Sequence, residues 1–314
     1  MLKLRATFTL VPRKVSGISV LRLFTMRFHY NALATLALSL SLIGCAPKSE
    51  SLGEHAIWVT IPPQKAMVEA VAGEWASVHV MVRPGQSPET YAPSVPQMVD
   101  LAKAEIYFGV GMPLERRILA KMERSMPQLH FVQTSDLIEA GHDHAHHAGC
   151  LHGDLDPHVW MDPVWMLEFV EHVRVALIEL EPASAEIFNT KAEALNRQLR
   201  ELDAALRLRF APFAGRSFYI NHPSLGHFAE RYGLVQRSIE HAGSAPSARQ
   251  IAGLVEAAKA DGVGAIFSQP EFGRSSAEVL ARALGVEVVE LDVLSVDYFR
   301  NMLDIAQALE DSFN

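Results

Sequence analysis

Short apolar runs alternate with segments of helical periodicity along most of this chain. Strands are expected at 57–61, 78–82, 105–110, 129–133, 217–221, 235–240, 265–268 and 287–291. Helices are expected at 65–72, 95–104, 114–124, 162–181, 183–209, 223–232, 247–260, 275–284 and 298–311. Strands that alternate with helices are typical of parallel βαβ units. The pattern therefore predicts an α/β fold of two similar lobes, each a small parallel sheet flanked by helices.

The longest helical segment, 183–209, stands between the two alternating regions. Leu195, Leu199, Leu202 and Leu206 recur at steps of four, three and four, which places them on one face of a helix. At about 1.5 Å per residue this helix would be roughly 40 Å long, enough to join two lobes rigidly. A coiled-coil dimer is the alternative, although the stripe lasts only two heptads. The expected N-terminal lobe, linking helix and C-terminal lobe are 56–181, 182–212 and 213–314.

The first 44 residues differ from the rest in charge, with six basic residues and no acidic one. Their apolar run, 32–43, is too short to span a bilayer comfortably, and the order of basic region, apolar run and small residues is typical of a signal peptide. The ending LIGC at 42–45 resembles a bacterial lipobox, which implies cleavage before Cys45 and lipidation of its sulfur. A start at Met26 would give a more compact signal. Residues 45–55 would then be a tether, and an apolar N-terminal helix of a cytosolic protein is the alternative.

Composition narrows the classes of function. Hydrophobic residues make up 49% and charged residues 20% of the 314, as in ordinary globular proteins. Loss of residues 1–44 would move the net charge from −8 to about −14, because six basic residues leave and no acidic one does. An acidic exported protein is a poor candidate for binding nucleic acid and suits a cation better. If Cys45 is lipidated, only Cys150 remains as a free cysteine, so no intrachain disulfide is expected.

Histidines gather in one short stretch, 141–163, which holds six of the 14. Its first part, 141–153, has low complexity and indicates a loose collector of metal, because imidazole is a common ligand of borderline metals. The accessory, low-affinity ligands predicted there are His142, His144, His146, His147 and His152. Cys150 lies in the same tract, either as a soft accessory ligand or as an incidental thiol. His158 follows in an ordered-looking segment and has the character of a fixed ligand.

Four polar side chains follow the predicted strands at the edge where ligands bind in parallel sheets. His222 and Asp292 come directly after strands, and His158 and Glu89 lie in loops after strands. Two imidazoles and two carboxylates would give a site of formal charge −2, which matches a divalent cation. Each has an ordinary alternative: a helix cap for His222, a packed loop residue for His158, a turn or N-cap for Asp292, and a solvated side chain for Glu89.

Two further groups follow the strand at 265–268. Gln269 and Glu271 face the same predicted edge, and we interpret them as groups that support the metal ligands.

The order of several motifs resembles the cluster A-I class of zinc- and manganese-binding lipoproteins that serve bacterial ABC importers. The motifs span about residues 57 to 309 and read PGQSPETY at 84–91, AEIY at 104–107, DPHVW at 156–160, NHPSLG at 221–226, PSAR at 246–249, IFSQP at 266–270 and LD at 291–292. A histidine-rich insertion before the second ligand is typical of the zinc-binding members.

This resemblance implies two α/β lobes bridged by a rigid helix, with the metal buried in the cleft between them. It carries the second, third and fourth ligands onto His158, His222 and Asp292. The first departs from the family pattern, because Glu89 stands where the family has a histidine. Zinc remains the expected metal, and the added carboxylate makes manganese or iron more tolerable.

The implied function is capture of Zn²⁺ outside the cytoplasm and delivery to an ABC permease and its ATPase, by a lipid-anchored monomer that is not an enzyme. A manganese or iron receptor of the same class is one alternative. An exported zinc hydrolase is another, although no His-Glu-x-x-His motif is present. An adhesin or a metal buffer without a permease is the third.

Overall fold

The computed structural model describes residues 55–134, 156–240 and 244–314. All of its elements belong to one compact unit, Leu52–Asn314. Cys45, the predicted signal peptide and the histidine tract at 141–153 lie outside the described residues. Within the described ranges, no helix has both the length and the apolar character needed to cross a membrane.

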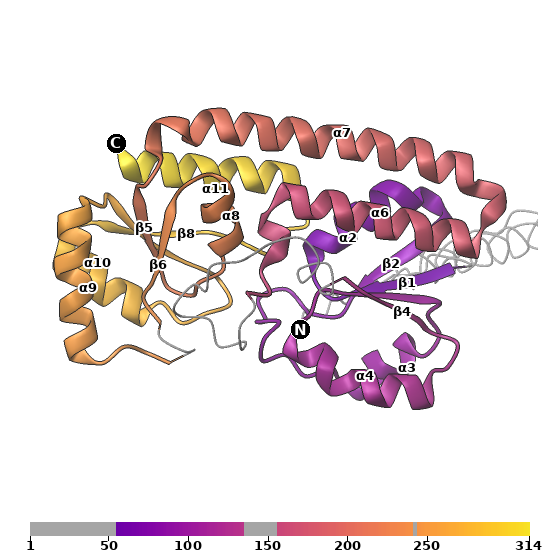
Figure 1. Ribbon diagram of the computed structural model, residues 1–314. Helices are drawn as coiled ribbons and strands as arrows, with labels where there is room; N and C mark the ends of the chain where they lie inside the picture. Colours follow the sequence, from indigo (N-terminus) through magenta and orange to yellow (C-terminus); the bar gives the residue numbers. More distant parts are fainter. Residues whose placement is uncertain (1–54, 135–155, 241–243) are drawn as a thin grey trace, which may run out of the picture. The chain divides into compact units, whose positions relative to one another are not determined.

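The N-terminal lobe is built on a parallel sheet of four strands in the order β2-β1-β3-β4 (Figure 1). The strands are β1 (His55–Val59), β2 (Ala76–Val80), β3 (Ile106–Gly109) and β4 (His130–Gln133). The helices between them are α2 (Pro62–Ala72), α3 (Val95–Leu101) and α4 (Pro113–Ser125), with a short 3₁₀ turn at Gly73–Trp75. All four residues of β3 are buried, as expected for a central strand covered on both faces.

The C-terminal lobe repeats this architecture with the order β6-β5-β7-β8, again all parallel. Its strands are β5 (Ser217–Ile220), β6 (Val235–Ser238), β7 (Ala265–Ser268) and β8 (Glu287–Glu290). Its helices are α8 (Gly226–Arg231), α9 (Ala248–Asp261), α10 (Ser275–Leu284) and α11 (Tyr298–Phe313). Because both sheets are parallel, the loops at the carboxyl ends of their strands are where a ligand site is expected.

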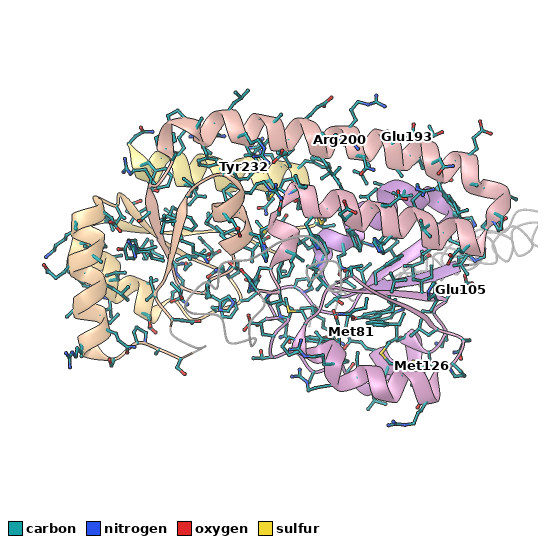
Figure 2. The ribbon with its side chains drawn as sticks, viewed as in Figure 1. Met81, Glu105, Met126, Glu193, Arg200 and Tyr232 are labelled. Carbon is teal, nitrogen blue, oxygen red and sulfur yellow. The ribbon has the colours of Figure 1, made fainter. Side chains whose placement is uncertain are left out.

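Two helices connect the sheets, α6 (Pro163–Leu180) and the 26-residue α7 (Ala185–Phe210). Short 3₁₀ turns flank them at Val159–Met161, Pro182–Ser184 and Ala211–Phe213. Helix α7 packs along α6 and α2 and reaches α11 at its other end (Figure 1). Exposed Glu193 and Arg200 lie on its outer face (Figure 2). The long helix therefore contacts elements of both lobes.

The main hydrophobic core runs continuously from the N-terminal sheet through α6 and α7 into the C-terminal lobe. Leu195, Leu199, Leu202 and Leu206 of α7 all belong to it. A smaller core fills the other face of the C-terminal sheet, beneath α9 and α10. The leucine stripe is thus covered within the chain, which removes the basis for the coiled-coil alternative.

The predicted fold class is confirmed, and each predicted strand and helix is present. The strand at 265–268 and the helix at 275–284 have the predicted bounds, and the other elements have ends shifted by one to three residues. Two helix starts shift by three residues, those of α2 and α8. Pro62 begins α2 instead of ending the strand before it, because the missing N–H of proline costs nothing at the first position of a helix. Pro113 and Pro163 occupy the same first position in α4 and α6. Helix α8 begins only at Gly226, because residues 222–225 form an irregular loop at the site described next.

Candidate metal centre

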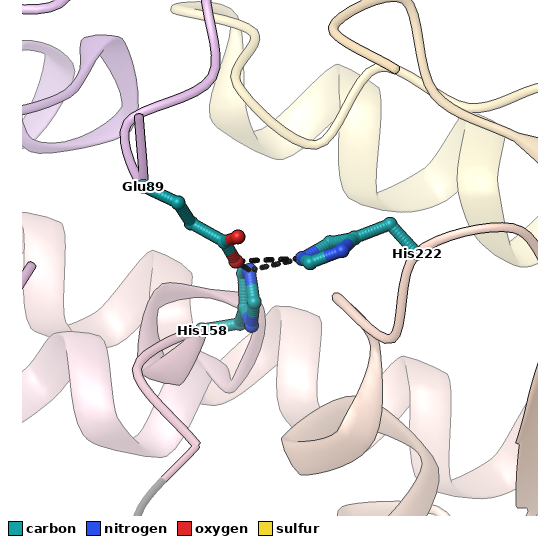
Figure 3. Close-up of side chains that lie close together, drawn as sticks. All are labelled: Glu89, His158 and His222. Carbon is teal, nitrogen blue, oxygen red and sulfur yellow. Dashed lines mark hydrogen bonds and ion pairs between the residues drawn. The ribbon is translucent and has the colours of Figure 1, made fainter. Parts of the chain in front are cut away.

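Three side chains converge between the two sheets: Glu89, His158 and His222 (Figure 3). Glu89 comes from the loop after β2, His158 from the segment before α6, and His222 from the loop after β5. His222 Nε2 lies 2.7 Å from Glu89 Oε1 and 3.3 Å from His158 Nε2. His158 Nε2 lies 3.6 Å from the same Glu89 oxygen. Both histidines are buried, with 4% of their surface exposed.

The spacing of these donors suits a small cation. Ligands that stand about 2.0–2.1 Å from a tetrahedral zinc ion are separated from one another by roughly 3.3 Å. Two of the three separations in this group, 3.3 and 3.6 Å, lie close to that value. The third, between Glu89 and His222, is a hydrogen bond of 2.7 Å. A small movement of the carboxylate would therefore place the three donor atoms at three corners of a coordination tetrahedron.

Asp156 orients His158. Its Oδ1 accepts hydrogen bonds from the His158 backbone N–H at 3.0 Å and from the ring Nδ1 at 2.7 Å, which leaves Nε2 facing the centre. Burial lowers the pKa of His158, while the Asp156 carboxylate opposes the shift. Burial would raise the pKa of Asp156, but the charges and hydrogen bonds of His158 and His227 lower it to about 2. The neutral imidazole that ligation requires is thus favoured at His158.

His222 is held on three sides. Its Nδ1 lies 3.3 Å from Glu240 Oε2, and the ring of Phe272 stacks on its ring at 4.1 Å. Gln269 accepts a hydrogen bond from the His222 N–H and donates one to the His222 carbonyl. Burial lowers the pKa of His222, but hydrogen bonds to Glu240 and Glu89 outweigh it and raise the pKa to about 9.

Glu89 is positioned by its own loop. Its backbone N–H donates to Ser87 Oγ at 3.3 Å. Two residues later, the Tyr91 hydroxyl donates to Gln97 of α3, and Arg117 of α4 donates to the Tyr91 carbonyl, both at 2.9 Å. The loop is therefore tied to two helices of the N-terminal lobe, and the Glu89 side chain is only 10% exposed.

The comparisons with known proteins fit this arrangement. Residues 57–312 match the family described as "Zinc-uptake complex component A periplasmic". The chain belongs to this family. Its members are metal-binding transport receptors and not enzymes, so the resemblance drawn from the motifs is confirmed.

The curated relatives described here differ from this chain at most positions of the sequence. The zinc-binding lipoprotein AdcA of Streptococcus pneumoniae is 27% identical over 269 residues, which are 82% of this chain and 53% of AdcA. The chain thus spans about half the length of that relative. A putative metal-binding protein of Chlamydia trachomatis is 25% identical over 272 residues, 85% of this chain and 94% of that protein.

Solved structures share the fold. A crystal structure of ZnuA has a TM-score of 0.76 and 28% identity, covering 83% of this chain and 99% of that one. A ZnuA deletion mutant with zinc bound gives the same TM-score and identity and covers 83% and 98%. The periplasmic zinc-binding protein TroA from Treponema pallidum, at 20% identity and a TM-score of 0.73 over 82% of this chain and 99% of TroA, shows the fold alone.

The structure brings together three of the four predicted ligands. Asp292 is exposed and is not in the cluster; its Oδ1 accepts a hydrogen bond from the Leu294 N–H at 2.9 Å. Of the two groups predicted to support the ligands, Gln269 clamps the backbone of His222. Glu271 lines a small pocket with Glu89 and His158. Burial raises the pKa of Glu271, and the nearby charge of Asp292 adds to the shift.

Asp156 and Glu240 each hold a histidine of the cluster, although neither was predicted as a functional residue. Two signals were present. Asp156 stands two residues before His158, from where a short carboxylate can turn back onto the ring. Glu240 lies beyond the carboxyl end of β6, next to the strand that leads to His222.

Proposed function

We propose that this chain captures Zn²⁺ outside the cytoplasm for an ABC importer, with Glu89, His158 and His222 as ligands. The convergence of two buried imidazoles and the carboxylate of Glu89 within 3.6 Å of one another carries the proposal. Two imidazoles and one carboxylate are a ligand set that zinc accepts. Membership in the periplasmic zinc-uptake family supports the choice of zinc and of an importer with a permease and an ATPase as partners.

Binding in this proposal involves no bond chemistry in the protein. The cation binds to the three donor side chains and displaces the proton held at His222. Helix α7 is packed against elements of both lobes, so loading proceeds through small shifts of the site loops. Since the leucine stripe of α7 is buried within the chain, we propose that the protein acts as a monomer.

The proposed location has two parts. The family description is periplasmic. An anchor through lipidated Cys45 rests on the sequence at 42–45, and AdcA, a relative, is named a lipoprotein. The histidine tract at 141–153 would collect metal near the site with low affinity. Its residues, like Cys45, lie outside the described ranges.

A carboxylate in this cluster also favours a second candidate, a manganese or iron receptor of the same class. Glu89 Oε1 lies close to the Nε2 atoms of both histidines. Manganese prefers oxygen ligands over nitrogen ligands.

The test is metal analysis of protein purified from its native compartment, followed by competition between Zn²⁺ and Mn²⁺. We expect one tightly bound zinc per chain, loss of that site in His222→Ala, and no change in His172→Ala. His172 is the matched control, because its ring contacts the Glu168 carbonyl on α6. A tight zinc site that survives His222→Ala, or native protein loaded with manganese, would overturn the proposal.

A further inference from the structure

The pocket beside the candidate metal centre holds one further carboxylate, which lies outside the three-residue cluster. Glu271 lies in the loop after β7 and lines the same pocket as Glu89 and His158. Its Oε2 is buried and has no hydrogen-bond partner among the described residues. An unpaired buried carboxylate oxygen is costly, so its position needs a compensating partner in some state of the protein.

The loop that carries Glu271 is attached to His222 on both sides. Before it, Gln269 Nε2 donates to the His222 carbonyl and to Ser224 Oγ, both at 2.6 Å. After it, the ring of Phe272 stacks on the His222 imidazole with an angle of 12° between the planes. The backbone at Glu271 is therefore held at a fixed place relative to a proposed ligand, while its side chain can still turn.

Asp292, the ligand predicted from the sequence, has a different environment. It is exposed, and it helps to shape the turn before α11. Its Oδ1 accepts from the Leu294 N–H, and its carbonyl accepts from Asn301 Nδ2 at 2.6 Å. The residues of this loop that line the pocket are Val293 and Leu294, which offer apolar side chains.

We propose that Glu271, in place of Asp292, supplies the fourth donor to the cation. This rests on the proposed function of the site. Glu89, Glu271 and two neutral imidazoles give a formal charge of −2, which a divalent cation balances. The carboxylate turns from the pocket wall to the centre when the cation enters, and its unpaired oxygen then gains a partner.

The experiment compares Glu271→Gln with Asp292→Asn in the full chain, using zinc affinity from chelator competition. Both substitutions keep the shape of the side chain and remove its charge. We expect Glu271→Gln to lower zinc affinity at least about tenfold and Asp292→Asn to change it less than about twofold. A crystal structure of the zinc-loaded wild-type protein should place a Glu271 oxygen about 2.0–2.2 Å from the metal.

The outcomes separate this inference from the proposed function. If wild type binds zinc tightly and His222→Ala does not, but Asp292 is the residue on the metal, only the assignment of Glu271 fails. If Glu271→Gln weakens binding but the crystal of the zinc-loaded wild-type protein shows no Glu271 oxygen on the metal, the assignment also fails. Glu271 is then a positioning residue. If wild type has no tight zinc site, the proposed function itself fails.

Discussion

Asp162 and Arg231 form a bidentate ion pair that links the start of α6 to the end of α8. Arg231 Nε donates to Oδ1 at 2.9 Å and Nη2 donates to Oδ2 at 2.5 Å. Asp162 is also the N-cap of α6, through a hydrogen bond from the Val164 N–H. The segment that carries His158 is thus fixed to the C-terminal lobe, although it follows the N-terminal sheet in sequence.

Arg231→Met should therefore destabilise the fold and weaken the site together. Removal of one partner from a largely buried pair costs roughly 3 kcal/mol, at the low end of the usual range because both side chains keep some access to water. Urea unfolding measures this, and chelator competition should show reduced zinc affinity. Arg300→Met is the control, since Arg300 pairs with Asp304 on the exposed face of α11 and should leave both quantities unchanged. Equal effects of the two substitutions would contradict this account.

Gly226→Ala should damage the metal site without touching a ligand. A Cβ at Gly226 would collide with Asp156 Oδ2, and that carboxylate holds the His158 ring. Loss of such a supporting contact lowers metal affinity by about 10–100-fold. Gly253→Ala in α9 is the control: a Cβ there meets nothing within 4 Å, and alanine should stabilise the helix by roughly 0.5–1 kcal/mol. Unchanged zinc affinity in Gly226→Ala would refute the role of Asp156.

Zinc binding should release about one proton near neutral pH. With a pKa of about 9, His222 is protonated in the metal-free protein at pH 7.5, and it must lose that proton to become a ligand. Affinity should therefore rise about tenfold per pH unit up to about 9. Calorimetry in two buffers of different ionisation enthalpy counts the protons released. Glu240→Gln removes one of the hydrogen bonds that raise this pKa, so it should release less than wild type at pH 8. A count near zero at pH 7.5 in wild type would contradict the assignment.

The same pKa has a consequence for the metal-free fold. Because the folded pKa of His222 lies above its unfolded value of about 6.5, its contribution to stability is complete below that pH and is lost as the pH rises through 9. The free energy of unfolding of the metal-free protein should accordingly lose this contribution between pH 6.5 and 9.

Deletion of residues 141–153 should remove weaker zinc sites and leave the tight one. The proposed ligands Glu89, His158 and His222 all lie outside this stretch, and Asp156 and Trp160 fix the His158 segment without it. Isothermal titration should show several sites in wild type and a single tight one in the variant. Replacement of the tract by a Gly-Ser linker of equal length controls for chain length. A large loss of tight affinity in both variants would show that the tract contributes ligands.

The fold could be predicted because each element carries its own periodicity. The buried strands β3 and β7 read as short apolar runs, and the leucine stripe of α7 identified the linking helix. The ends of an element were harder to predict where a proline could either end one element or begin the next. Pro62 could end the preceding strand or begin a helix, and only packing decides between the two.

The three residues of the cluster, Glu89, His158 and His222, could be predicted from the sequence. His158 and His222 stand in motifs whose place at the strand ends is fixed by topology. Asp292 and Glu271 both follow strands of the same sheet, and sequence position does not distinguish them. What separates them is three-dimensional: one carboxylate lies at the surface of a turn, and the other is held against the His222 ring by its neighbours.

The fluorescence of Trp160 should report zinc binding at the site. Its ring is fully buried, lies 5.2 Å from the His158 ring and donates from Nε1 to the Val293 carbonyl at 2.8 Å. The other tryptophans, Trp58, Trp75 and Trp165, stack on rings outside the cluster. A divalent charge arriving beside His158 would change the electric field at the neighbouring Trp160 indole. The protein thus carries an intrinsic optical reporter, and its fluorescence would record the rate of zinc uptake and release without a label.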